Sequence, residues 1–241
     1  WLPSAPLHVL LYKFLKWEEF MPKFAHLPLI LKPDGNGKLS KRDGDRLGFP
    51  VFPLEWKDPK TSDFSSGYRE KDYFSEAFVN MLAFLGWNPG IEKELYSIDE
   101  LISDFSLGRV GKSGAKFDPE KAKWFNQQHL RLKSNSELAI LMKQNCSYDV
   151  SEVYLEKVAE LMKERSTFQS ELISEKYFFE SVEDYDEKTF RKKWKSDSFS
   201  LVNEFFGLLN NIENFSSMSI ESSFIKFIEK KEIGMGSILP N

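Results

Sequence analysis

From Ser134 onward, apolar side chains recur at helical spacing, and no segment alternates apolar and polar residues as a strand does. The segments with this spacing are 137–144, 151–163, 168–174, 187–195, 198–211 and 220–230. Ser151 begins the clearest one, because serine is a favoured helix cap and apolar residues follow it on one face. The pattern predicts an all-helical bundle or cage over 134–241.

The first part of the chain mixes helix and strand signals. Residues 6–16 have helical spacing with proline in the first turn, and 24–31 is an apolar run of strand character. A turn composed of Pro, Asp, Gly, Asn and Gly follows at 33–37, and a polar, basic segment lies behind it at 38–44. We expect residues 1–46 to be the last piece of an α/β domain, and both chain ends to be cut points within a longer protein.

Residues 47–133 combine a polar loop with helices. The segment 48–67 is rich in Pro, Asp and Ser and predicts a surface loop. Helical spacing then returns at 72–85, 97–105 and 118–130. The chain is therefore predicted to be mainly α.

The chain has one cysteine, Cys146, and three histidines that lie far apart, His8, His26 and His129. A structural zinc ion needs four ligands, usually in closely spaced pairs, so we expect no metal site and no disulfide within the chain. We expect Cys146 to be a small buried hydrophobe. No apolar run approaches the ~20 residues of a membrane span, and the first residues lack a signal-peptide pattern. These features favour a cytoplasmic protein without a membrane segment.

The sharpest feature is Lys38-Leu39-Ser40-Lys41-Arg42, which places three cations beside a hydroxyl. Lysine ammonium groups are mobile point charges that bind phosphate oxygens and stabilise charge that develops in phosphoryl or nucleotidyl transfer. Flanking glycines would let the segment close around a nucleotide. On the pattern alone, a solvated basic turn is the alternative.

The same five residues resemble the KMSKS signature of class I aminoacyl-tRNA synthetases, in the variant Lys-Leu-Ser-Lys-Arg. Around them, nearly the whole chain resembles bacterial glutamyl-tRNA synthetases, with motifs in the same order. The stretches that carry the resemblance are 1–12, 24–31, 85–87, 116–118, Lys123-Trp124-Phe125-Asn126, 129–131, 161–167 and 177–179.

The resemblance implies an enzyme that activates glutamate with ATP and Mg²⁺ and then transfers the glutamyl group to the terminal adenosine of tRNA. It implies the end of a Rossmann-like catalytic domain at 1–46 and a stem-contact domain at 47–133. It further implies that 134–241 is the anticodon-binding domain of this family, an α-helix cage that is truncated at its C-terminus.

The resemblance also implies roles for individual residues. Lys38 and Lys41 would contact the phosphates and stabilise the departing pyrophosphate, and Ser40 and Arg42 would shape the loop. The remaining nucleotide contacts would be the backbone of Leu29 and Ile30 against adenine, and Trp1 near the pocket for ATP and the tRNA end.

The family also needs a His-x-Gly-His motif for ATP, and this sequence has none. The residues that bind glutamate belong to a part of the enzyme that this sequence does not contain. Because positioning and charge stabilisation supply most of the rate, we expect the chain alone neither to activate glutamate nor to charge tRNA. We expect the parent enzyme to be a monomer.

A basic stretch at 109–133 contains seven cationic and two acidic residues, a net charge of +5 in a chain of net charge −4. Such a stretch suits a phosphate backbone, and a solvated helix face is the alternative. In the resembling family, this region lies along the inner curve of the tRNA. We therefore expect Lys116, Lys123 and Arg131 to contact the tRNA stem.

Arg165 matches an arginine-bearing stretch of the family's anticodon-binding helices. An arginine presents a planar fork of donors to a base edge, so we expect Arg165 to read an anticodon base, with Lys163 as a neighbouring contact. The alternative is that Arg165 caps helix carbonyls. Residues 177–179, Tyr-Phe-Phe, are expected to belong to the core rather than to stack on bases.

The residues argue against three alternative functions. A non-catalytic tRNA-binding module is one, and a lone helix and strand at 1–46 argue against it. The related enzyme that places glutamate on a tRNA base has no anticodon domain, and the glutaminyl relative reads anticodons with β-barrels. The sequence does not decide between glutamate tRNA alone and glutamine tRNA as well, nor which base Arg165 reads.

Overall fold

The computed structural model describes residues 2–181, 183 and 186–238, without the side chains of Lys41, Arg42 and Asp45. The chain forms two compact units, Trp1–Phe179 and Glu180–Asn241. This division lies within the expected helical domain 134–241. The expected boundaries after residues 46 and 133 stay predictions.

The N-terminal segment adds little to the core. Its helices are η1 (Leu2–Ser4), α1 (Ala5–Phe14) and η2 (Glu18–Phe20). Helix α1 is mostly apolar in sequence and yet has no buried residue. Of the expected strand 24–31, only β1 (Ile30–Leu31) has strand geometry, because its parallel partner β4 (Ala115–Lys116) is only two residues long.

The basic segment after the turn is partly helical, which the sequence did not predict. Helix α2 (Lys41–Leu47) begins directly after Ser40 and ends at Gly48, whose left-handed φ of 80° suits a glycine. The region 48–67 is largely loop, as expected. It includes the short antiparallel pair β2 (Trp56–Lys57) and β3 (Phe64–Ser65).

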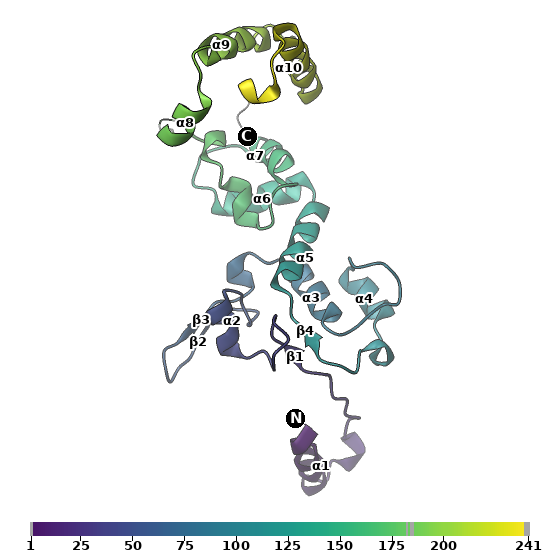
Figure 1. Ribbon diagram of the computed structural model, residues 1–241. Coiled ribbons are helices and arrows are strands. Elements are labelled where there is room, and N and C mark those ends of the chain that lie inside the picture. Colours follow the sequence, from purple (N-terminus) through teal and green to yellow (C-terminus); the bar gives the residue numbers. More distant parts are fainter. Residues whose placement is uncertain (1, 182, 184–185, 239–241) are drawn as a thin grey trace. The chain divides into compact units, whose positions relative to one another are not determined.

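The middle of the first unit is helical (Figure 1). Its helices are η3 (Arg69–Lys71), α3 (Ser75–Phe84), α4 (Ile98–Asp104), η4 (Leu107–Arg109) and α5 (Pro119–Leu132). Helix α3 packs against α4 and α5, and the core there is largely aromatic. The buried residues of its main cluster are Phe49, Tyr68, Met81, Phe117, Ala122 and Phe125. The helices expected at 72–85, 97–105 and 118–130 are therefore present.

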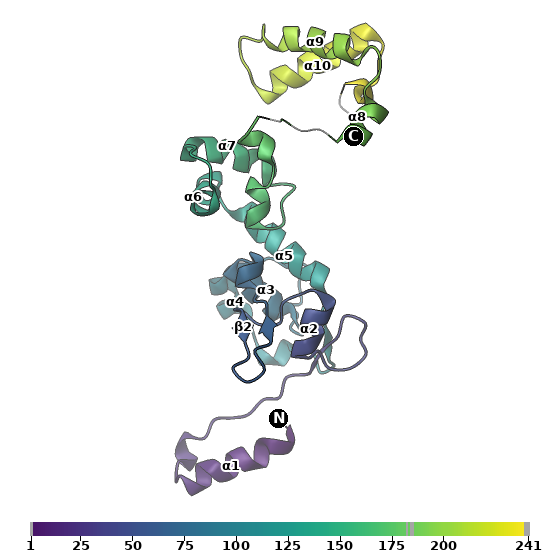
Figure 2. The ribbon, with the colours of Figure 1, turned by 90° about the vertical axis from the view of Figure 1, so that its left-hand side faces the viewer.

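Helices α6 (Asn135–Asn145) and α7 (Glu152–Met162) pack against each other and complete the first unit with η5 (Gln169–Ile173) and η6 (Lys176–Phe178). Figure 2 shows α5 running from the region of α3 and α4 towards α6 and α7. Ser134 and Ser151 cap their helices, as their hydroxyls accept from the N–H of Glu137 (3.1 Å) and of Tyr154 (3.2 Å). The expected helix at 168–174 is a 3₁₀ helix instead.

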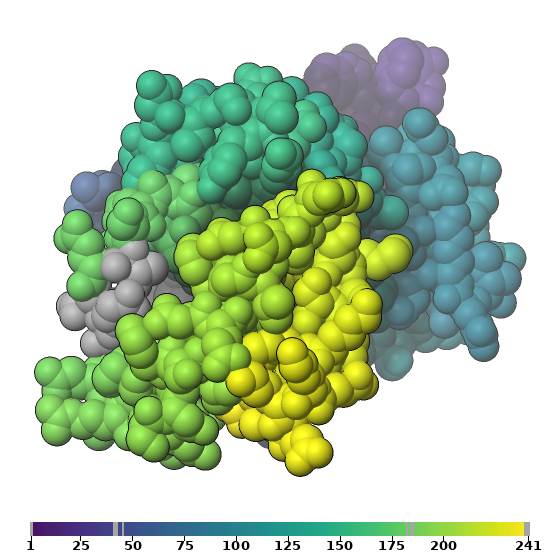
Figure 3. Space-filling view, turned by 90° about the horizontal axis from the view of Figure 1, so that it is seen from above, coloured from purple at the N-terminus to yellow at the C-terminus, as the bar shows by residue number. Residues whose placement is uncertain are grey.

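The second unit consists of α8 (Glu187–Lys193), α9 (Ser198–Leu209), α10 (Ser217–Lys231) and η7 (Met235–Ser237). Helices α9 and α10 pack together around a small core, whose buried residues are Leu201, Phe224, Phe227 and Ile228. Figure 3 shows this unit as one packed body, from α8 in green to η7 in yellow. Helical spacing at 187–195, 198–211 and 220–230 thus predicted real helices, and the mainly α class is confirmed.

Candidate functional site

The predicted turn at 33–37 closes a tight hairpin. The N–H of Lys32 donates to the carbonyl of Gly37 (3.0 Å), and the N–H of Gly35 donates to the carbonyl of Lys32 (2.8 Å). Gly35 and Gly37 have φ values of +80° and +88°, which side chains with a Cβ rarely adopt. The glycines therefore make the sharp reversal that brings the basic segment back onto β1.

This reversal places Lys38 opposite Leu31 as an isolated antiparallel pair. The N–H of Leu39 donates to the carbonyl of Ile30 (2.8 Å), which fixes the register. Lys38 is exposed, and its ammonium has no hydrogen bond or ion pair within the described residues. The ammonium of Lys38 is therefore available for a ligand.

Ser40 and Asp43 fix the start of α2. The N–H and the hydroxyl of Ser40 donate to Asp43 Oδ2 at 3.0 and 2.5 Å. On the other oxygen, Oδ1, Asp43 pairs with Lys32 Nζ (3.2 Å) and Arg46 Nη2 (3.1 Å). The Ser40 hydroxyl and N–H, together with these cations, hold the pKa of Asp43 well below its usual range.

Asp43 is thus a residue that the sequence reasoning missed. Its carboxylate joins the hairpin, through Lys32, to helix α2, through Ser40 and Arg46, and only 7% of Asp43 is exposed. The signal was present as a serine followed three residues later by an acid, the spacing of a capping box. That spacing explains why 41–47 is helical although it contains several charges.

The structure describes the predicted nucleotide contacts only in part. Trp1 and the side chains of Lys41 and Arg42 lie outside the described part of the structure. Leu29 and Ile30 lie at the hairpin as predicted, but their carbonyls already accept the N–H groups of Ala115 (3.1 Å) and Leu39 (2.8 Å). The backbone of 29–30 is therefore partly occupied by its own sheet.

Most cations of the basic stretch 109–133 already have protein partners. Arg131 Nε pairs with Glu164 Oε2 at 3.2 Å, and Lys123 Nζ pairs with Glu120 Oε1 at 2.8 Å. The other paired cations are Arg109 with the Pro89 carbonyl, Lys121 with Glu94, and Lys133 with Glu76. Lys112 and Lys116 are exposed and have no such partner in the described part of the chain. Of the predicted stem contacts, only Lys116 is therefore unengaged.

Lys163 and Arg165 also differ in whether another group of the protein already binds their side chains. The Lys163 ammonium is half-buried and donates to the carbonyl of Lys133, at the C-terminal end of α5. The Arg165 side chain is exposed and has no hydrogen bond or ion pair among the described residues. Lys163 thus links the end of α7 to the end of α5, whereas the Arg165 side chain is exposed to solvent.

The aromatic residues 177–179 divide between core and surface. Phe178 and Phe179 pack against the core of α6 and α7, and Phe179 stacks on Tyr148 with ring centroids 4.8 Å apart. Tyr177 is 52% exposed. The expectation of a core role thus fits Phe178 and Phe179 better than Tyr177.

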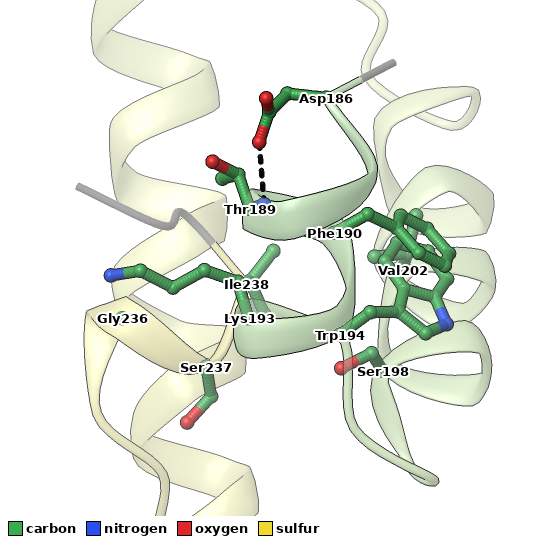
Figure 4. Close-up of a pocket in the computed structure, with 10 residues that line it drawn as sticks. All are labelled: Asp186, Thr189, Phe190, Lys193, Trp194, Ser198, Val202, Gly236, Ser237 and Ile238. Atoms are coloured by element: carbon green, nitrogen blue, oxygen red, sulfur yellow. Dashed lines mark hydrogen bonds between the residues drawn. The ribbon is translucent and has the colours of Figure 1, made fainter.

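The second unit contains a cavity of about 480 Å³ beside α8. Figure 4 shows Phe190 and Trp194 near Val202 on one side of α8, and Lys193 and Ile238 on the other. The rings of Phe190 and Trp194 are stacked, with centroids 5.1 Å apart. The cavity walls contain no residue that the sequence analysis had assigned to nucleotide or tRNA.

The described residues contain neither a cluster of metal ligands nor a helix that could span a membrane. No group of three or more His, Cys, Asp or Glu side chains there is arranged to hold a metal ion. Within the same residues, no helix is both long enough and apolar enough to span a bilayer. Cys146 is half-buried, and its thiol contacts the carbonyl of Tyr148 at 3.8 Å.

Known protein families match the chain from end to end. The family described as tRNA synthetases class I (E and Q), catalytic domain, matches residues 1–124, and an anticodon binding domain family matches residues 123–241. The glutamate–tRNA ligase of Parabacteroides distasonis is 55% identical over 99% of the chain, and that of Phocaeicola vulgatus is 53% identical over 99%. Each match covers 48% of the relative, so the chain spans about half the length of these curated relatives.

A solved structure agrees with these matches. The crystal structure of a glutamate tRNA ligase from Elizabethkingia meningosepticum, in complex with its amino acid, superposes with a TM-score of 0.83 at 46% identity. The superposition covers 99% of this chain and 48% of that one. At this identity, the fold and the order of the elements are shared over the whole chain.

Proposed function

Because the chain belongs to the class I tRNA synthetases for glutamate and glutamine, we propose that it serves glutamate–tRNA ligation, in which glutamate is activated with ATP and joined to tRNA. The observation that carries this proposal is the hairpin with its free lysine, Lys38, inside a catalytic-domain match that continues directly into an anticodon-binding match. The relatives named as glutamate–tRNA ligases favour glutamate over glutamine. A binding module without a link to ligation is not favoured, because the catalytic-domain match reaches residue 124.

The hairpin suits the triphosphate of ATP. Lys38 offers an unpaired ammonium, whereas the nearby carboxylate of Asp43 is already neutralised by Lys32 and Arg46 and so does not repel phosphate. ATP supplies the phosphoanhydride whose cleavage activates the glutamate carboxyl. In this proposal Lys38 and Lys41 hold the phosphates, and Ser40 and Arg42 shape the start of α2 around them.

The remaining nucleotide contacts keep their proposed roles. We propose that the backbone of Leu29 and Ile30 contacts adenine, and that Trp1, which lies outside the described residues, would contribute to the pocket shared with the tRNA end. Mg²⁺ accompanies ATP, and we assign no ligand of the ion to this chain.

For tRNA, the exposed and unpaired side chains are the stronger candidates. Arg165 is proposed to read an anticodon base, and Lys116 is free to contact phosphate. Lys123 and Arg131 would first have to exchange their glutamate partners for phosphates. For the exposed Lys123 such an exchange costs little, because exposed ion pairs contribute only about 0–1 kcal/mol. Arg131 is half-buried and also donates to the Glu164 carbonyl, so it would have to give up that bond as well. Lys163 is proposed to support Arg165 rather than to bind RNA strongly itself.

The proposal is tested by tRNA binding. We expect the chain to bind a glutamate-accepting tRNA and to bind the same tRNA with an altered anticodon less tightly, as measured by a gel-shift titration. Arg165→Ala should weaken binding of the normal tRNA by ~1–3 kcal/mol, about 5- to 150-fold. The matched control is Arg69→Ala, which also removes an exposed arginine. Equal affinity for both tRNAs would contradict anticodon reading.

Catalysis by the chain alone is a separate question. Since the sequence carries no His-x-Gly-His motif, we expect no ATP–pyrophosphate exchange with glutamate above a blank without protein. Exchange above that blank would show that the chain contains a complete activation site. Ligation of this kind serves protein synthesis, so we infer a cytoplasmic location and keep a monomer as the expected state.

A further inference from the structure

Leu31 lies between two lysines on neighbouring strands. On one side it pairs with Lys38 across the hairpin, and on the other it pairs with Lys116 in the parallel sheet of β1 and β4. The N–H of Phe117 donates to the Leu31 carbonyl (3.0 Å), which fixes the second register. The order across the sheet is therefore Lys38, Leu31, Lys116, although 78 residues of sequence separate the two lysines.

The two lysines share one face of this sheet. Neighbours along a strand point to opposite faces, and residues paired across strands point to the same face. Leu39 and Phe117, which follow the lysines directly, both pack into the cluster around Phe49 and so mark the core face. Lys38 and Lys116 are accordingly both exposed on the opposite, solvent face.

Carboxylates close in sequence are engaged elsewhere. Asp34 accepts from the N–H of Asn36 (2.8 Å), and Asp118 caps α5 by accepting from the N–H of Glu120 (2.9 Å). Asp43 is bound to Ser40 and two cations. Asp34 and Asp118 keep their negative charges, but neither Lys38 nor Lys116 forms an ion pair with an acid among the described residues.

The spacing fits a polyphosphate. Strand neighbours lie ~4.5–4.8 Å apart, so the Cα atoms of the two lysines are roughly 9–10 Å from each other. Each lysine carries its ammonium on a flexible four-carbon stem, so both can reach adjacent phosphates of one ligand placed over Leu31. An exposed, uncompensated pair of this kind binds a multiply charged anion more tightly than a single phosphate.

We propose that Lys116 is a further lysine of the triphosphate site, in addition to Lys38 and Lys41, and holds the same polyphosphate as Lys38 from the neighbouring strand. This inference rests on the proposed function, and it assigns Lys116 to the nucleotide instead of to the tRNA stem. In both assignments Lys116 would bind a phosphate oxygen, either of a polyphosphate or of the tRNA backbone. The experiment therefore compares a polyphosphate with tRNA.

The probes are inorganic tripolyphosphate, titrated calorimetrically at low salt, and a glutamate-accepting tRNA, titrated by gel shift. Lys116→Ala should weaken tripolyphosphate binding about fivefold, as Lys38→Ala does, and Lys116→Arg should restore most of it. The control is Lys57→Ala, which removes an exposed lysine from another two-residue strand, β2. That control should change tripolyphosphate affinity less than twofold, and thermal melts should show that all four variants are folded.

The outcomes distinguish a failure of the inference about Lys116 from a failure of the proposed phosphate binding by the hairpin. If Lys38→Ala weakens tripolyphosphate binding and Lys116→Ala does not, the inference is wrong and the lysine hairpin stands. If Lys116→Ala weakens only tRNA binding, Lys116 is a stem contact and the inference is again wrong. If the unmodified chain binds tRNA but not tripolyphosphate, both the proposed phosphate binding by the hairpin and the inference about Lys116 are wrong.

Discussion

Removal of the Asn126 side chain should cost the first unit a large part of its stability. It lies on α5 with no exposed surface, and its side chain bridges segments far apart in sequence. Its Oδ1 accepts from the N–H of Phe74 (2.8 Å), while its Nδ2 donates to the carbonyls of Thr167 (2.7 Å) and Asp72 (3.2 Å). Asn126→Ala would leave one buried donor and two carbonyls unpaired.

The magnitude follows from those three groups. An unpaired buried polar group costs ~1–3 kcal/mol, and the Asp72 bond is the longest and weakest of the three, so we expect a loss of about 3–5 kcal/mol. This is a large share of the ~5–15 kcal/mol that stabilises a typical domain. For a domain of this size, each kcal/mol shifts Tm by roughly 2–4 °C, so Tm should fall by about 6–20 °C.

The assay is urea unfolding followed by circular dichroism. Asn126→Ala should lower the midpoint without changing the slope m, because the surface exposed on unfolding is nearly the same. Gln128→Ala removes another amide from the same helix and should shift the unfolding free energy by less than about 1 kcal/mol. Asn126→Asp can still accept from Phe74 but cannot donate to either carbonyl, so it should be at least as unstable as the alanine variant at neutral pH. A loss below about 1 kcal/mol for Asn126→Ala would refute the reasoning.

Three further predictions concern pH, the two cations after α7, and β4. Burial lowers the pKa of His129 below its ordinary value of 6.5, so the unfolded chain takes up the proton first, and the free energy of unfolding should fall as the pH drops below 6.5. His129→Gln should flatten that fall, as measured by urea unfolding at several pH values. Lys163→Ala should lower Tm, because its ammonium holds the Lys133 carbonyl, whereas Arg165→Ala should leave Tm unchanged. Gly114→Ala should disturb the pairing of β1 with β4, since a Cβ there would lie 2.9 Å from Leu31 Cγ and 3.0 Å from the Leu29 carbonyl oxygen. Weaker tripolyphosphate binding by that variant, in the calorimetric titration, would follow from the displaced strand.

The elements that were predicted correctly have local causes. Ser134 and Ser151 cap helices whose first turns follow directly, and the turn glycines Gly35 and Gly37 require no distant residue. The helix at 41–47 was missed for the opposite reason: its charges dominated the interpretation, although the Ser40–Asp43 spacing was visible. Local spacing thus predicts an element well when its capping residues are weighed together with its charges.

The partners of the predicted site residues could not be predicted, because they are distant in sequence. Arg131 contacts Glu164 across 33 residues, Lys121 contacts Glu94 across 27, and Lys133 contacts Glu76 across 57. Helix α5 packs against α3, which carries Glu76, and the segments after α3 and α7 that carry Glu94 and Glu164 reach α5 only in the folded chain. Sequence alone therefore located the cations of the basic stretch and gave no sign that most of them were paired.

This pairing changes what the basic stretch can do. A net charge of +5 over 109–133 suggests a uniform surface for phosphate, but charge that is neutralised by a neighbouring carboxylate attracts RNA weakly at a distance. Lys112 and Lys116, which have no partner among the described residues, lie just before α5, and Lys116 borders the hairpin that carries Lys38. Within the basic stretch, the lysine nearest the proposed polyphosphate site is therefore one without a partner among the described residues, and Arg165 likewise has none there. Since a lysine recognises charge and an arginine recognises the shape of a base edge, the pairing leaves each kind of cation unengaged at the place where its chemistry is needed.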